Sequence, residues 1–158
     1  MRTKLTVIVF LVANAILYAR LDVKKPTQDH PTSFAIVIDE ETYHEAKDAV
    51  LAYRDAVEND GLSTYILIND WKNPDEIRSE IIKLYNQQPP LEGIVLVGDI
   101  PIPMIRNAEH LTSSFKYENN SLSYFNSSVP SDRFYDDFNL QFRYLTQDEE
   151  NKLCFYYS

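Results

Sequence analysis

The sequence predicts an α/β fold with three layers, in which a parallel sheet lies between helices. Three short apolar runs, at 34–38, 65–68 and 94–97, alternate with two stretches of helical periodicity. Short apolar runs bounded by turn residues are typical of buried strands. Strands that alternate with helices predict a parallel sheet with right-handed crossovers. The expected strand order at the start of this sheet is 2-1-3, with the first strand in the centre.

The first helix follows the run at 34–38. Thr42-x-x-Glu45 matches a capping box, in which both side chains satisfy free amides at a helix start. Apolar residues then recur at helical spacing, at Ala46, Ala49, Val50, Tyr53 and Val57. Asp60-Gly61 is expected to end the helix, because glycine adopts the left-handed cap conformation without strain.

The second helix follows the run at 65–68. Asn73 is a suitable cap and Pro74 suits the first turn. The face expected to be buried consists of Ile77, Ile81, Leu84 and Tyr85. Later in the chain, we expect a short helix within 105–117 and strands at 140–145 and 153–157. Because the sequence stops within the last strand, the domain at 34–158 is expected to be incomplete at its C-terminus.

The first 19 residues match a secretory signal peptide. A basic start precedes an apolar stretch at 5–17, and small residues follow at Ala15 and Ala19, the two expected cleavage points. The stretch is shorter than the ~20 residues of a membrane-spanning helix. We therefore expect export to the periplasm, cell surface or medium, with no membrane span after cleavage. Residues 20–33 are polar and are predicted to be a linker.

The charge balance excludes some functional classes. Without residues 1–19 the chain has 13 basic and 24 acidic side chains, a net charge of −11. Nucleic-acid binding requires a basic surface, so it is not expected. The only cysteine is Cys154, which excludes an intrachain disulfide. With three glycines in total, the chain has no glycine-rich phosphate loop.

Asp99 is the first candidate site residue. It follows the strand at 94–97 and comes directly after Gly98, which permits a sharp turn. Ligands of open α/β sheets bind at the carboxyl ends of the strands, so Asp99 and Asp39 are expected to flank one crevice. The alternative is structural, because an aspartate in such a turn often accepts amide hydrogen bonds.

A second group of candidates follows in 131–137. Asp132 and Tyr135 are candidates for the edge of a substrate cleft, although Asp132 also suits a turn cap. Asp136 and Asp137 supply the oxygen ligands that calcium prefers, so calcium is the one cofactor considered. The spacing does not match an EF-hand loop.

His110 follows the third strand and is a further candidate for the crevice. A pair formed by His110 and Cys154 is possible in principle, since such partners meet in space and not in sequence. Cys154 lies in an apolar strand, however, where a cysteine is more often an inert small hydrophobe. No catalytic residue is therefore assigned.

Two motifs resemble the first subdomain of gingipain-type cysteine peptidases, which have a caspase-like fold. These motifs are Leu96-Val-Gly-Asp99 and Pro130-Ser-Asp-Arg-Phe-Tyr135, and the resemblance extends over 34–145. It implies a protein or peptide substrate and proteolysis. In the family, the catalytic His and Cys come from the second subdomain. No residue here corresponds to either, so this chain alone is expected to be inactive.

Two further hypotheses stay open. The chain could be a non-catalytic module of the cell envelope that binds or assembles with an envelope protein. It could also be a small complete hydrolase that uses Cys154.

Overall fold

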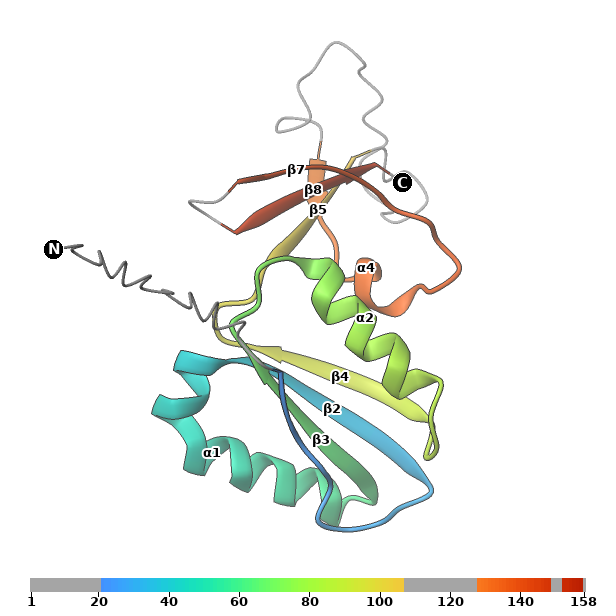
Figure 1. Cartoon of the computed structure of the whole chain (residues 1–158). Coiled ribbons are helices and arrows are strands. Elements are labelled where there is room, and N and C mark those ends of the chain that lie inside the picture. Colours follow the sequence, from blue (N-terminus) through green and yellow to red (C-terminus); the bar gives the residue numbers. More distant parts are fainter. Residues whose placement is uncertain (1–20, 107–127, 149–151, 158) are drawn as a thin grey trace, which may run out of the picture.

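The computed structural model describes residues 21–106, 128–148 and 152–157 (Figure 1). The predicted signal peptide and His110 lie outside these ranges. The predicted α/β class is confirmed, since two four-stranded mixed sheets are combined with three described helices. None of the described helices is long and apolar enough to cross a membrane.

The first sheet contains the three predicted strands. They are β2 (Thr32–Asp39), β3 (Leu62–Asn69) and β4 (Leu91–Val97), and β2 lies between the other two and parallel to both. A fourth strand, β1 (Asp22–Lys24), pairs antiparallel with β3. The sheet is therefore mixed, and part of the segment predicted to be a linker belongs to it. Three residues are too few to show strand periodicity, which explains the error.

One helix covers each face of this sheet (Figure 1). Alternate residues of a strand point to opposite faces. On one face, Ile36 and Ile38 pack with Tyr43 and Val50 of α1 (Glu40–Asn59). On the other face, Ala35 and Val37 pack with Ile77 and Ile81 of α2 (Pro74–Tyr85). Burial on both faces explains why the strand at 34–38 is apolar without alternation.

The start of α1 differs from the prediction, whereas the start of α2 agrees with it. Asp39 caps α1 and accepts a hydrogen bond from the Thr42 amide at 2.9 Å, in place of the expected capping box. Tyr53 of the predicted buried stripe is 45% exposed. Asn73 caps α2 as predicted, accepting from the Glu76 amide at 3.1 Å.

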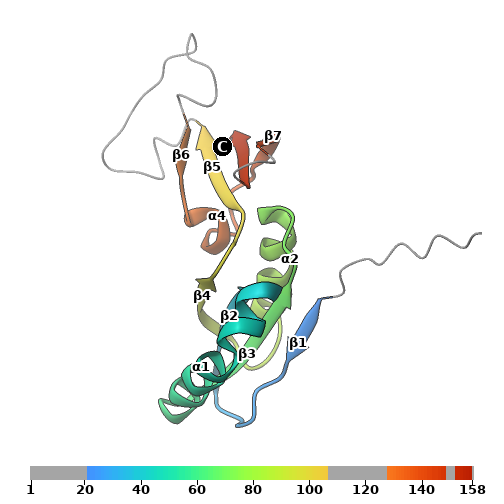
Figure 2. The same ribbon diagram turned by 90° about the vertical axis from the view of Figure 1, so that its left-hand side faces the viewer.

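The second sheet follows directly from β4 through the loop at 98–101 (Figures 1 and 2). Its order is β6-β5-β8-β7, and β5 and β8 are its parallel pair. The strands are β5 (Ile102–Arg106), β6 (Ser128–Pro130), β7 (Arg143–Asp148) and β8 (Leu153–Tyr157), and the short helix α4 (Arg133–Asp136) follows β6.

Predictions for this half were partly right. The strand at 153–157 is confirmed, and the strand expected at 140–145 lies at 143–148. The helix expected within 105–117 is wrong at its start, because Ile105 and Arg106 belong to β5. The rest of that helix lies outside the described residues.

Candidate functional site

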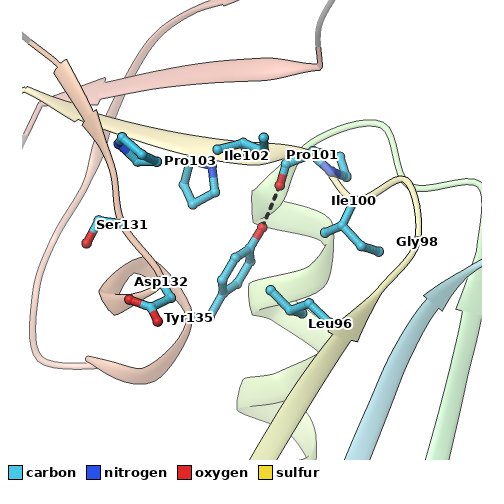
Figure 3. Close-up of a pocket in the computed structure, with 10 residues that line it drawn as sticks. Leu96, Gly98, Ile100, Pro101, Ile102, Pro103, Ser131, Asp132 and Tyr135 are labelled. Carbon is cyan, nitrogen blue, oxygen red and sulfur yellow. Dashed lines mark hydrogen bonds between the residues drawn. The ribbon is translucent and has the colours of Figure 1, made fainter.

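A pocket of about 520 Å³ lies at the carboxyl end of β4. One wall is formed by residues of the segment 96–103, and the other by Pro130, Ser131, Asp132 and Tyr135 (Figure 3). The two segments that were singled out in the sequence therefore meet around one cavity. Three of the four residues named on the second wall come from the loop and helix that follow β6.

Tyr135 is the most deeply buried residue of the second wall. Its side chain is 2% exposed, and its hydroxyl donates a hydrogen bond to the Pro101 carbonyl at 2.9 Å (Figure 3). Burial raises the pKa of Tyr135 far above its ordinary value, with smaller contributions from Cys154 and Asp75. The phenol is therefore neutral and acts as a fixed, uncharged wall.

Asp132 supplies the negative charge of the pocket. It is exposed, and although it stands at the cap position of α4, its side chain makes no capping hydrogen bond. Its carboxylate is thus not committed to the alternative structural role considered from the sequence. An exposed carboxylate on an apolar wall is suited to accept hydrogen bonds from a ligand or to pair with a cation.

Asp99 lies beside the pocket and is not among the residues that line it. Its side chain is 70% exposed and pairs with Lys152 at 2.7 Å. Its backbone amide donates to Asp39 Oδ2 at 2.8 Å. Asp39 and Asp99 are thus adjacent, but they do not flank the pocket as expected, since the Asp39 residue is only 6% exposed and its carboxylate serves the helix cap.

Position 98 requires a glycine, because the Asp39 carboxylate lies where a side chain would begin. Its φ of +83° is in the region that side chains other than glycine rarely adopt. A Cβ atom at Gly98 would lie 1.8 Å from Asp39 Oδ2 and 2.4 Å from Thr42 Oγ1. The Gly-Asp pair therefore has a structural task, which is to close the turn between the sheets over the start of α1.

The Asp39 carboxylate is held in its ionised form. Burial opposes ionisation, but hydrogen bonds from Thr42 and from the Asp99 amide outweigh it, so the pKa of Asp39 lies below its ordinary value. The carboxylate also lies at the N-terminus of α1, where the helix dipole favours negative charge.

The carboxylates of Asp136 and Asp137 already interact with other residues of the chain. Both pair with Arg133, at 3.7 and 3.2 Å, and Asp137 also accepts a hydrogen bond from the Asn139 amide. Within the described residues, no group of three or more His, Cys, Asp or Glu is placed to hold a metal ion. Calcium binding at these two residues stays a prediction.

Cys154 is buried within β8. Burial, with smaller effects from Asp75 and Glu76, raises the pKa of its thiol to about 11. The thiol is therefore protonated at neutral pH, which is unfavourable for a nucleophile. His110 lies outside the described residues, so the structure does not describe its distance from Cys154.

Arg78, which the sequence did not single out, fixes one wall of the pocket. From α2 its guanidinium donates to the backbone carbonyls of Phe134, Asp137 and Leu140. It also lies over the rings of Phe134 and Phe142, at 5.2 and 5.1 Å from their centroids. The one signal in the sequence is an arginine directly after Ile77 of the buried face.

In comparisons with known proteins, no family model, no curated protein and no solved structure matches the chain.

Proposed function

We propose that this chain is an exported, gingipain-type peptidase subdomain that forms one wall of a cleft for a polypeptide substrate. The observation that carries the proposal is the pocket itself. Residues of both motifs on which the resemblance rests line one cavity at the carboxyl end of a sheet strand: Leu96 and Gly98 from the first, and Pro130, Ser131, Asp132 and Tyr135 from the second. Ligand sites of open α/β sheets are found at this position.

The architecture of the first sheet supports the finer proposal of a three-layer, caspase-like subdomain. A central strand has a parallel neighbour on each side, and one helix covers each face. The order β3-β2-β4 of the three parallel strands supports the proposed 2-1-3 arrangement.

The role proposed for the pocket is binding and not bond cleavage. Its walls combine apolar side chains with one uncommitted carboxylate, that of Asp132. The only thiol of the chain, that of Cys154, is buried and protonated at neutral pH. Proteolysis would therefore depend on a nucleophile outside this chain.

The test is made on the protein isolated from its source, with fluorogenic peptides as substrates. We expect hydrolysis that iodoacetamide blocks, a KM that rises in Asp132→Asn, and no change in Cys154→Ser. Absence of both hydrolysis and peptide binding would refute the proposal. A loss of hydrolysis in Cys154→Ser, in a variant that remains folded, would refute the passive role given to that residue.

A second candidate is a non-catalytic binding or assembly module of the cell envelope on the same fold. The inert environment of Cys154 favours it. Saturable peptide binding without any thiol-sensitive hydrolysis would support this candidate over the first.

A further inference from the structure

The outer edge of β4 has no partner among the described strands. β4 ends the order β1-β3-β2-β4 and pairs only with β2. None of its seven residues is buried, whereas residues 35–39 of β2 all are. Proteins usually protect such edges with lysine, proline or inward-pointing charges. The sequence of β4 contains a single charge, Glu92, and neither lysine nor proline.

A regular stretch of this edge is available for pairing. The register between β2 and β4 shifts once, so that Ser33 is opposite Leu91 and Phe34 is opposite Gly93. Glu92 is therefore the extra residue of a bulge. From Gly93 to Val97 the ladder with β2 is continuous. Backbone groups of alternate residues in this stretch point away from β2 and are directed at the edge.

Two pockets lie beside this edge, on the face covered by α2. The 520 Å³ pocket includes Leu96, and a second pocket of about 160 Å³ includes Ile94 together with Tyr85 and Phe138. Tyr135 lines both. Ile94 and Leu96 are two positions apart on one face, a separation of roughly 7 Å in a strand. Ile94 of one pocket and Leu96 of the other therefore have the spacing of two successive same-face side chains, as in an added strand.

The charges around the edge identify the class of occupant. Three carboxylates line the two pockets, those of Glu92, Asp132 and Asp136, and none of the lining residues is Lys or Arg. Asp136 is paired with Arg133, whereas Asp132 makes no capping hydrogen bond. A second copy of this strongly acidic chain would bring like charges together. The charge balance instead favours a basic segment of another protein.

We propose that the outer edge of β4 binds an extended polypeptide segment by strand addition, with alternate apolar side chains in the two pockets and basic residues at its ends. In this mode, main-chain hydrogen bonds provide affinity and the pockets for alternate side chains provide specificity. The inference rests on the proposed polypeptide cleft, to which it adds the backbone edge that holds the ligand and the class of sequence that it takes.

The experiment uses the full chain and a fluorescein-labelled hexapeptide with a lysine at each end and alternating valine and leucine between them. The matched probe has the same sequence with alternate backbone amides N-methylated, which removes donors and leaves the side chains. Fluorescence anisotropy gives Kd for each probe. Two variants report on charge: Asp132→Lys in the wall of the larger pocket, and Asp48→Lys on the exposed face of α1 as the matched control.

We expect saturable binding of the first probe and at least tenfold weaker binding of the methylated one. Asp132→Lys should weaken binding by up to about fivefold, the size of an exposed ion pair, and Asp48→Lys should not. Backbone amide NMR shifts should be concentrated in 93–97.

Equal Kd values for the two probes would overturn strand addition, and if Asp132→Lys still weakened binding, the polypeptide cleft itself would stand. If methylation weakened binding but Asp132→Lys had no effect, strand addition would be supported and the proposed contact between the ligand and Asp132 would be refuted. Self-association of the chain through 93–97 would overturn the choice of occupant.

Discussion

Replacing Gly98 with alanine tests the link between the two sheets. The left-handed backbone alone costs a residue with a side chain roughly 1–2 kcal/mol. The new Cβ would lie 1.8 Å from Asp39 Oδ2, so the carboxylate must move and lose its bonds to the amides of Thr42 and Asp99. Loss of a helix cap costs about 0.5–2 kcal/mol, and loss of a hydrogen bond to a charged group about 1.5–3 kcal/mol. We expect Gly98→Ala to lower the free energy of unfolding by about 3–7 kcal/mol in total.

The assay is urea unfolding followed by the fluorescence of Trp71, which is the only tryptophan and is 1% exposed. Gly61→Ala is the matched control, because Gly61 also has a positive φ, +98°, but a Cβ there meets no atom within 4 Å. It should cost only the backbone term of roughly 1–2 kcal/mol. In an Asp39→Ala background, Gly98→Ala should cost less than in the wild type, because the nearest atom is gone, and more than Gly61→Ala, because the Cβ still lies 2.4 Å from Thr42 Oγ1. Equal losses for the two glycine variants, or an undiminished loss in that background, would refute the steric argument.

Three further predictions concern the contacts around the pocket. Arg78→Lys keeps the charge but not the planar fork, so it should cost about 2–3 kcal/mol of unfolding free energy and speed amide hydrogen exchange in 133–142. Arg54→Lys is the control, because Arg54 pairs with the exposed carboxylate of the neighbouring Asp55. Equal effects of the two variants would contradict the role of Arg78. Because the folded pKa of Asp39 lies below the ordinary 3.8, its stabilisation is complete above that value and is lost as pH falls through the folded pKa. The urea midpoints of the wild type and Asp39→Asn should therefore converge on acidification, and a constant difference would contradict this. With a thiol pKa of about 11, Cys154 should react with Ellman's reagent at pH 8 about 100-fold more slowly in the folded than in the unfolded chain, because so little thiolate is present; equal rates would show that the thiol is not buried.

The sequence was most informative where the physical signals are local and repeated. Alternating apolar runs and helical stripes predicted the core of the first sheet, and the Asn73 cap has an unambiguous spacing to Glu76. The rule that ligand sites gather at the carboxyl ends of strands singled out the loop after β4, and this loop lines a pocket together with residues of the segment at 131–135.

What escaped prediction depends on contacts between distant residues. The role of Gly98 is set by Asp39, far away in the sequence, and no local pattern gives that distance. The strand β5 contains Pro103, which argues against a strand unless the missing amide is tolerated by its neighbours. The position of the Asp99 side chain is likewise set by Lys152, which the turn itself does not predict.

The way in which Arg78 holds its wall has a consequence for sequence divergence. Its acceptors are backbone carbonyls, which every amino acid provides, so the identities of Asp137 and Leu140 are not needed for these hydrogen bonds. The only side chains that these contacts require are the arginine itself and the aromatic rings beside it. The wall of the pocket can therefore acquire new side chains, and with them new ligand preferences, while the Arg78 contacts that position it stay the same.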